Sequence, residues 1–425
     1  MSRTMQLSKN ASGPWFTVWC LIASFGTYFC MYAFRKPMST GLYTGYVMAG
    51  IGYKAILIIS QVLGYMTSKF IGIRVISELR AASRIRLIIG LVLFAEAALL
   101  FFGLVPFPYN FLFLFLNGLP LGMIWGVVFS FLEGRRYTEV LSIGLSISII
   151  AASGILKTTY LEVHSFFPFI SEFWLPFVMG AFFLPFFCFF VWMLSVIPAP
   201  TEEDKLLRAE RIPMTKADKK VIIRRYGPGL ICIIIVYCML ATMRDFRDNF
   251  SVEIWNDIDA HWHKEVLAQT EILCSIFVLL AVGALSLIKN NNRGFWITLL
   301  LILGGILLGG ASTLLFHWKI ISGFSWMLLL GSGLFLAYVP VQVALFERMI
   351  ALFKIRANAG YFVYLCDAVG YLGSVGILLY KEFLAKELSW AVMLSAFSYV
   401  MTIISVLLLV LTILFFSRRY RQQVR

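Results

Sequence analysis

The chain has 425 residues, of which 60% are hydrophobic and only 14% are charged, and its formal net charge is +14. An ordinary soluble domain carries roughly 25% charged residues, and a soluble core could not bury this much apolar surface. The composition therefore excludes a soluble globular protein and predicts a chain that spends most of its length in lipid.

Apolar runs separated by charged or turn residues recur along the whole chain. A helix of about 20 residues crosses the roughly 30 Å of hydrocarbon in a bilayer, and most runs have this length. The first run is too long for the apolar region of a signal peptide and lacks a small-x-small cleavage motif, so we predict a membrane helix there. We predict twelve transmembrane helices, at residues 15–34, 52–73, 87–105, 109–131, 140–159, 174–197, 227–246, 267–288, 295–315, 322–346, 358–380 and 390–416.

The loop charges predict an orientation. Most of the 36 Lys and Arg residues fall in segments that are cytoplasmic if the N-terminus is cytoplasmic. This bias follows the positive-inside rule, so we predict a multi-pass protein of the cytoplasmic (inner) membrane with both termini in the cytoplasm. Because the basic residues are scattered over many short loops, the net charge does not indicate nucleic-acid binding.

A polar stretch divides the chain into two halves. It spans residues 198–226, between the sixth and seventh predicted helices, and is rich in Glu, Asp, Lys and Arg. We predict an N-terminal six-helix bundle at 1–197, a cytoplasmic linker at 198–226 and a C-terminal six-helix bundle at 227–425. Two pseudo-symmetric six-helix bundles joined by a charged linker are the plan of the major facilitator superfamily, so the expected fold class is an all-α polytopic membrane protein of that fold.

Glycines spaced by four residues predict close helix packing. They are Gly118, Gly122 and Gly126 in the fourth predicted helix, and Gly305 and Gly309 in the ninth. Small residues at this interval let helix backbones approach closely in lipid. We interpret them as packing positions.

Charged residues well inside the apolar runs include Lys69, Glu96, Lys157 and Asp367. A charge in the membrane is costly unless it has a partner or lines a wet cavity, so each is a candidate site residue. The two lysines lie near helix ends and either extend to the interface or contribute to a site. The two acids are too short and too deep to reach the interface, which leaves an ion pair or proton coupling; for Glu96 an ion pair is slightly favoured. Uncharged polar groups join them in the predicted helices: Gln61, Tyr65, Asn117 and Gln342.

The densest polar group is Arg35-Lys36-Pro37. The planar fork of arginine donors suits phosphate or carboxylate, and lysine adds a mobile point charge. Pro37 and Gly41 would interrupt the helix and leave backbone groups facing a cavity. The alternative is a cluster at the external interface, because the apolar run ends at Phe34.

Two motifs carry a resemblance to a known family. The first helix ends in Tyr32-Ala33-Phe34-Arg35-Lys36-Pro37-Met38-Ser39, and the second contains Gly64-Tyr65-Met66-Thr67-Ser68-Lys69-Phe70-Ile71-Gly72. These segments resemble the first two helices of the organophosphate:phosphate antiporters, the glycerol-3-phosphate transporter group of the major facilitator superfamily. In that group an arginine of the first helix and one of the seventh face each other across the central cavity and hold the phosphate.

The resemblance implies substrate roles for Arg35, Lys36 and Lys69, and a first helix that continues past the Arg-Lys pair. The segment Tyr237-x6-Arg244, with Trp255 downstream, resembles the seventh-helix counterpart and implies the same role for Arg244. The chain departs from the family in two respects. It lacks the G-x-x-x-D-R-x-G-R-R-type signature between the second and third helices, and no histidine lies in the predicted fourth or fifth helix.

One loop of the sequence also fits an enzyme. The loop 255–263 contains a D-x-D and an H-x-H pattern, which could ligate a metal in a membrane-embedded transferase. No G-x-S-x-G, Walker, G-x-G-x-x-G or H-E-x-x-H motif occurs, and the seven cysteines lie in apolar runs without metal-site spacing. We favour a solvated loop and expect no enzyme activity, no metal and no cofactor.

The sequence as a whole predicts a secondary transporter for a small anionic solute, such as an organophosphate or phosphate, that acts as a monomer by alternating access. Arg35 and Arg244 are the expected anion clamps, and Asp367 or Glu96 is the expected carrier of a coupling proton if its surroundings raise its pKa. Two alternatives remain: a receptor or assembly protein with a transporter-like fold, and a metal-dependent transferase using 255–263. Further expected site residues are Lys36, Gln61, Tyr65, Lys69 and, for coupling or ion pairing, Lys157.

Overall fold

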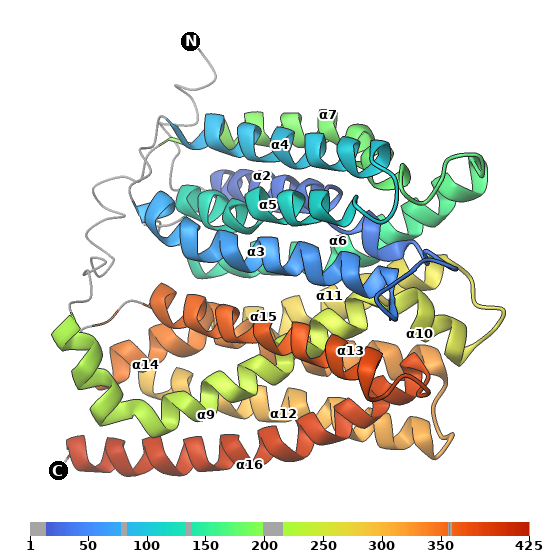
Figure 1. Ribbon diagram of the computed structural model, residues 1–425. Helices are drawn as coiled ribbons and strands as arrows, with labels where there is room; N and C mark the ends of the chain where they lie inside the picture. Colours follow the sequence, from blue (N-terminus) through green and yellow to red (C-terminus); the bar gives the residue numbers. More distant parts are fainter. Residues whose placement is uncertain are drawn as a thin grey trace. The chain divides into compact units, whose positions relative to one another are not determined.

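The computed structural model describes residues 14–77, 83–132, 138–198, 216–355, 357 and 359–424. This part of the chain is mainly helical, and it contains twelve helices that are long and apolar enough to cross a membrane (Figure 1). The prediction of about twelve spans in a helical membrane protein is confirmed.

The first six spans follow one another with short connections. They are α2 (Pro14–Tyr32), α3 (Tyr53–Ser77), α4 (Arg84–Leu104), α5 (Phe111–Leu132), α6 (Thr138–Phe166) and α7 (Leu175–Ser195). Between α2 and α3 the chain forms a 3-10 turn, η1 (Pro37–Thr40), and two antiparallel two-residue strands, β1 (Val47–Met48) and β2 (Ile51–Gly52). α6 is longer than the predicted fifth helix and includes His164 in its last turn, so the expectation that this span lacks a histidine is wrong.

The later spans begin with a long helix. They are α9 (Lys216–Asn249), α11 (Glu265–Leu285), α12 (Asn291–His317), α13 (Gly323–Pro340) continued by the π-turn η3 (Val341–Leu345) and α14 (Phe346–Phe353), α15 (Ala359–Phe383) and α16 (Trp390–Val424). A short helix, α10 (Ser251–Ile258), follows α9 directly. Of the predicted linker 198–226, residues 216–226 belong to α9, and residues 199–215 lie outside the described part.

The chain divides into two compact units. Unit 1 contains residues 1–209 with the short segments 249–252 and 262–272, and unit 2 contains residues 210–248, 253–261 and 273–425. The junction of α9 with α10 and the start of α11 therefore pack within unit 1, although most of the chain after residue 210 belongs to unit 2.

Glycines bring helix backbones into direct contact in both units. A Cβ atom on Gly118 of α5 would lie 2.2 Å from the carbonyl oxygen of Gln61 on α3, and one on Gly64 would lie 2.1 Å from the carbonyl oxygen of Phe115. In unit 2, a Cβ on Gly305 of α12 would lie 2.5 Å from the carbonyl oxygen of Gly333 on α13. Gly118 and Gly305 are thus the close-packing positions that the spacing predicted, and the contact of α3 with α5 places polar side chains of the two helices within hydrogen-bonding distance.

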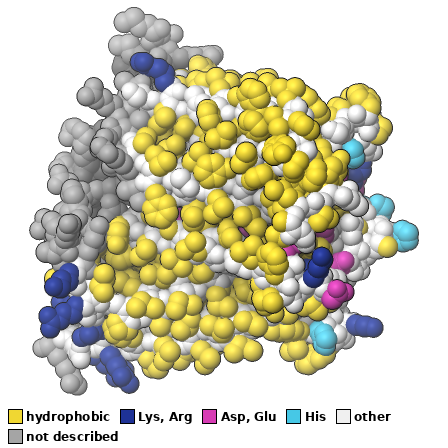
Figure 2. All heavy atoms as spheres, viewed as in Figure 1, with side chains coloured by type: hydrophobic (Ala, Val, Ile, Leu, Met, Phe, Trp, Pro, Cys, Tyr) yellow, Lys and Arg dark blue, Asp and Glu magenta, His cyan; other side chains and the backbone are white. Residues whose placement is uncertain are grey.

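Apolar side chains cover the faces that meet lipid. In Figure 2 hydrophobic side chains cover much of the visible surface, and Lys and Arg gather towards the helix ends. Examples of exposed large side chains are Leu280 on α11, Leu300 on α12 and Leu407 on α16. Since lipid tails are as apolar as these side chains, their exposure is what a membrane-spanning helix requires.

Candidate functional site

The first functional segment is the break that follows α2. The helix ends at Tyr32, the chain continues in turns, and η1 begins at Pro37. Proline has no backbone N–H and cannot continue the helical hydrogen-bond pattern, so carbonyl groups of the preceding turn need other donors. The predicted interruption is confirmed, whereas the implied continuation of the first helix past Arg35 and Lys36 is wrong.

Two amide side chains supply the missing donors. Asn117 Nδ2 on α5 donates to the carbonyl oxygen of Phe34 at 3.0 Å and to that of Ala95 on α4, also at 3.0 Å. Gln61 Nε2 on α3 donates to the carbonyl oxygen of Arg35 at 3.3 Å and to Asn117 Oδ1 at 2.8 Å. Buried carbonyls are thereby satisfied, and side chains of α3 and α5 hold the backbone that carries Arg35 and Lys36.

Beyond η1, the chain is anchored by Glu172, which accepts hydrogen bonds from the backbone N–H groups of Leu42 and Tyr43 at 3.1 and 2.7 Å. Tyr43 lies outside the membrane-spanning segments, and its burial raises the pKa of its phenol well above the ordinary value. The turn segment is therefore held at both ends.

Arg35 and Lys69 lie against the same aromatic ring. The guanidinium carbon of Arg35 is 4.2 Å from the centroid of Tyr65, and Lys69 Nζ is 5.7 Å from it and 5.9 Å from the ring of Trp125. Arg35 is 7% exposed and Lys69 6%. We call Arg35, Tyr65 and Lys69 the Tyr65 cluster. Cations over aromatic faces gain electrostatic energy, so the ring of Tyr65 stabilises both side chains in their buried positions.

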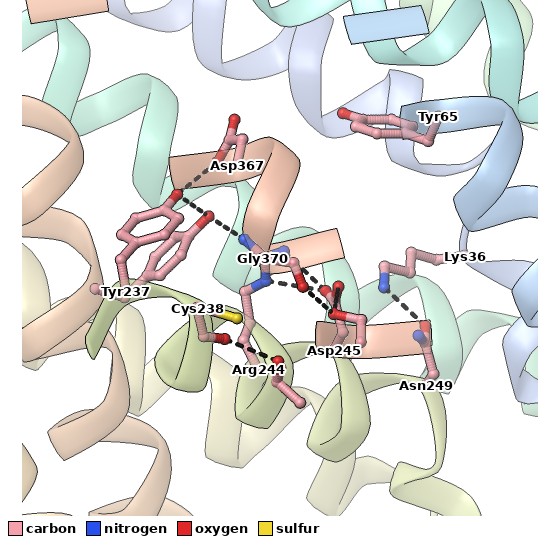
Figure 3. Close-up of polar contacts among 12 residues, drawn as sticks. Lys36, Tyr65, Tyr237, Cys238, Arg244, Asp245, Asn249, Asp367 and Gly370 are labelled. Carbon is pink, nitrogen blue, oxygen red and sulfur yellow. Dashed lines mark hydrogen bonds and ion pairs between the residues drawn. The ribbon is translucent and has the colours of Figure 1, made fainter. Parts of the chain in front are cut away.

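Three buried lysines of unit 1 meet the junction of α9 with α10. Lys36 Nζ donates to Asn249 Oδ1 at 3.3 Å (Figure 3), and Lys157 Nζ donates to Ser251 Oγ at 3.0 Å. Lys54 Nζ lies 5.4 Å from the ring centroid of Phe250. Lys157 is 2% exposed and bonded inside the protein, so extension to the membrane interface does not describe it.

Arg244 occupies the corresponding place in unit 2. Its Nε and Nη2 atoms both donate to Asp245 Oδ1, at 3.0 and 2.8 Å, and Asp245 Oδ2 accepts a hydrogen bond from Ser374 Oγ at 2.7 Å (Figure 3). The side chains of Arg244 and Asp245 are only 12% and 6% exposed. This is a buried, hydrogen-bonded ion pair, in which removing either partner leaves an uncompensated charge.

Two tyrosines connect this ion pair to Asp367. Arg244 Nη1 donates to the hydroxyl of Tyr338 on α13, and its guanidinium carbon lies 4.6 Å from that ring. The hydroxyls of Tyr338 and Tyr237 are 2.9 Å apart, and Tyr237 donates to Asp367 Oδ1 at 2.5 Å. Gln342 Nε2, in η3, donates to both hydroxyls at 2.9 Å. We call this set the Arg244 network: Tyr237, Arg244, Asp245, Tyr338, Gln342, Asp367 and Ser374.

Helix periodicity explains why these side chains meet. Tyr237 and Arg244 are seven residues apart, about two turns, so both project from one face of α9. Asp367 and Ser374 have the same spacing on α15. A π-turn, which occurs in helices mostly at functional sites, starts directly after α13 and carries Gln342.

The structure places the remaining predicted residues apart from these groups. Glu96 lies on α4, is 8% exposed, and packs so closely on Gly180 of α7 that a Cβ there would be 2.0 Å from Glu96 Oε2. Within the described residues, neither carboxylate oxygen of Glu96 has a hydrogen-bond partner, so the favoured ion pair is not found there. Sequence reasoning missed Asp245, Tyr338 and Ser374. Of these only Asp245 had a signal, its position beside Arg244.

The loop with the D-x-D and H-x-H patterns uses its carboxylates locally. Asp257 Oδ2 accepts from the backbone N–H of Ala391 at 3.0 Å, near the start of α16, and Asp259 Oδ1 accepts from the N–H of His261 at 2.9 Å. No group of three or more His, Cys, Asp or Glu residues able to hold a metal occurs among the residues that the structure describes.

The architecture is that of the major facilitator superfamily, and several solved transporters share it. A mutant of the nucleoside transporter NupG superposes with a TM-score of 0.60 and 14% identity, over 94% of this chain and 99% of that one. The POT family transporter PepTSo superposes with a TM-score of 0.60 and 14% identity, over 95% of this chain and 98% of that one. A mutant peptide transporter POT in complex with alafosfalin superposes with a TM-score of 0.59 and 16% identity, over 94% of this chain and 95% of that one.

The chain belongs to the family described as "Family of unknown function (DUF5690)", whose model matches residues 37–419. No curated protein matches the sequence. The comparisons therefore show the fold of this chain and leave its function open.

Proposed function

We propose that this protein is a secondary transporter that moves a small organic anion, with phosphate esters as the first candidates, by alternating access. The observation that carries the proposal is the burial of Arg35, Lys36 and Lys69 in a membrane-spanning fold. Charged groups inside a membrane protein are costly and mark substrate or ion pathways. A site that concentrates positive charge is complementary to an anion.

The geometry gives the residues distinct roles. Arg35 offers a planar fork of donors to two oxygens of a phosphate, while Lys36 and Lys69 add point charges on flexible side chains. Gln61 bonds the Arg35 carbonyl and Asn117, so we assign it to positioning the turn. Arg244 is the second proposed clamp. The motifs around Arg35 and Lys69, which resemble the organophosphate:phosphate antiporters, support this cargo class.

The test is transport by the purified protein in reconstituted vesicles, with radiolabelled glycerol 3-phosphate as the probe. Arg35→Ala is expected to reduce the uptake rate by about 100-fold, because the buried fork that binds the phosphoryl oxygens is lost. Arg35→Lys keeps the positive charge without the planar fork of donors, so its uptake rate is expected to lie between those of the wild type and Arg35→Ala. The matched control is Arg225→Ala, which removes an exposed arginine that also lies near a tyrosine ring. Uptake by Arg35→Ala at the wild-type rate would refute the proposal.

The same vesicles separate the anion proposal from other cargo. A nucleoside and a peptide, chosen because the similar folds include a nucleoside transporter and a peptide transporter, are offered in parallel with the phosphate ester. Uptake of a neutral nucleoside with no uptake of the ester would overturn the proposal that the substrate is an anion. The proposal of secondary transport would stand. No movement of any solute would favour the receptor alternative, and an activity that a chelator removes and that depends on Asp257 would favour the transferase.

A further inference from the structure

The charge balance of the Arg244 network is the starting point. Two carboxylates, Asp245 and Asp367, share the network with one guanidinium, and Asp245 is the one that contacts it directly. A guanidinium has five N–H donors. Two are directed at Asp245 and one at Tyr338. An anion that binds Arg244 must either displace the Asp245 carboxylate or lie beside it.

Both arrangements are unfavourable while Asp245 is ionised. Displacement leaves a buried carboxylate without its cation, and binding alongside places two negative charges on one guanidinium. A proton on Asp245 removes the penalty in either case. Anion binding at Arg244 and proton binding at Asp245 are therefore coupled in the favourable direction, and each strengthens the other.

The surroundings already accommodate the protonated form. Ser374 Oγ lies 2.7 Å from Asp245 Oδ2 and 3.1 Å from the carbonyl oxygen of Gly370 (Figure 3). The serine hydroxyl donates to the carboxylate when Asp245 is ionised. When Asp245 carries a proton, the acid donates to Ser374 Oγ and the serine hydrogen turns to Gly370. Both states are hydrogen-bonded without movement of the helices.

The other charged and titratable groups leave this role to Asp245. From α13, Tyr338 contacts Arg244 rather than Asp245. From α15, Tyr371 interacts with the charge of Arg244, and Asp367 accepts a hydrogen bond from the hydroxyl of Tyr237. On α9 itself, Arg244 is the direct partner of Asp245.

We propose that Asp245 is the proton-binding group of this transporter, so that each anion bound at Arg244 is accompanied by one proton taken up by Asp245. The inference rests on the proposed function, because it requires that an anion binds Arg244. The proton comes from water at one side of the membrane, forms an O–H bond with a carboxylate oxygen of Asp245, and returns to water when the anion leaves. The protein then couples anion movement to a proton gradient.

The test is calorimetry on the full-length protein in lipid nanodiscs, with glycerol 3-phosphate as the probe, in buffers that differ in ionisation enthalpy. The dependence on the buffer gives the number of protons taken up per anion bound. The probe's own titration is the same for every variant and cancels in the comparison. We expect the wild type to take up one proton more than Asp245→Asn does, and its affinity to fall by up to about tenfold per pH unit as the pH rises.

Two further variants make the assignment specific. Asp367→Asn removes the other carboxylate of the network, and Asp257→Asn removes a carboxylate outside it; both are expected to keep the extra proton. Loss of the proton in Asp367→Asn and not in Asp245→Asn would overturn the inference. If Asp245→Asn does not fold, proton uptake is measured on Ser374→Ala and on the wild type. A wild type that binds the anion without taking up a proton overturns this inference but not the proposed function.

Sulfate, a tetrahedral dianion that does not titrate in this pH range, is the second probe. Sulfate binding that does not weaken as the pH rises would contradict the coupling, because the charge of sulfate itself stays constant. A wild type that binds neither probe at any pH overturns the proposed function, and this inference with it. The failures of the two proposals are thus distinguishable.

Discussion

The two units contain the same three-residue arrangement around an arginine. Arg35 and Arg244 each lie seven residues after a tyrosine, Tyr28 and Tyr237. Each guanidinium lies over the ring of a second tyrosine, at 4.2 Å from Tyr65 and 4.6 Å from Tyr338. The two hydroxyls approach each other in both units, to 3.5 Å in unit 1 and 2.9 Å in unit 2. The same local geometry therefore serves both arginines.

The residues that follow the two arginines differ in charge from each other. Arg35 is followed by Lys36, and Arg244 is followed by Asp245, which forms an ion pair with it. The second tyrosine also comes from different spans, α3 in unit 1 and α13 in unit 2. The comparison teaches that one arrangement occurs in two settings: in unit 1 the arginine is followed by a second basic residue, and in unit 2 it is paired with a carboxylate.

The strongest way to break this comparison is to remove the carboxylate of unit 2. Asp245→Ala leaves the buried guanidinium of Arg244 without its counter-charge, and we expect the free energy of unfolding to fall by about 3–5 kcal/mol. The control is Glu162→Ala, which removes an ion pair with Lys264 of equal length, 2.8 Å, whose side chains are about one-third exposed. An exposed pair contributes less than about 1 kcal/mol. Unfolding in denaturing detergent measures both, and equal costs would show that Arg244 does not depend on Asp245.

A second prediction concerns the turn that carries Arg35. Asn117→Leu removes the donors to two buried carbonyls and the acceptor of Gln61, and we expect a loss of about 2–4 kcal/mol in the free energy of unfolding together with weaker anion binding. Asn290→Ala is the control, because it removes an exposed helix cap on α12 that contributes about 1 kcal/mol. Full anion affinity in Asn117→Leu would show that Arg35 does not need the turn to be fixed.

The sequence was sufficient for the features that lipid imposes. Apolar runs predicted the spans because every backbone group must be satisfied inside the helix, and Pro37 predicted the interruption that follows Tyr32. The spacing of Gly118 predicted close packing of its helix, although not that the partner is α3. Helix ends were less certain. α9 begins at Lys216, inside the predicted linker, because charged residues can continue a helix beyond the membrane.

The partners of Arg244 could not be predicted in the same way. Tyr338 and Ser374 are about 100 residues away in sequence, on helices whose rotation decides which face meets α9. Nothing in the residues themselves distinguishes Tyr338 from other tyrosines. Asp245 was adjacent to Arg244, but two neighbouring residues on a helix point in different directions, so an ion pair between them is not the default expectation.

The third prediction compares the two tyrosines under the arginines. Tyr338→Phe removes a hydroxyl that bonds Arg244 and Gln342 and contacts Tyr237, so we expect a loss of about 1–2 kcal/mol in the free energy of unfolding. Tyr65→Phe keeps the ring under Arg35 and loses a 3.5 Å hydroxyl contact with Tyr28, which is longer than the 2.9 Å contact in unit 2, so we expect a smaller loss. Melting temperatures of the two variants in one detergent rank them. The reverse order would mean that Arg35 depends on the hydroxyl and that the two arrangements are not used differently.

The smallest expected effect is at Glu96, a buried carboxylate of unit 1 that belongs to neither arrangement. Glutamine has the same shape and no charge to desolvate, so Glu96→Gln is expected to change the free energy of unfolding by less than about 0.5 kcal/mol or to raise it. The number of protons taken up with glycerol 3-phosphate is expected to stay at the wild-type value, in contrast to Asp245→Asn. Calorimetry on the two variants side by side is the measurement. If Glu96→Gln abolished the proton uptake and Asp245→Asn kept it, the proton-binding group would lie in unit 1. The ion pair of Arg244 with Asp245 would then be structural.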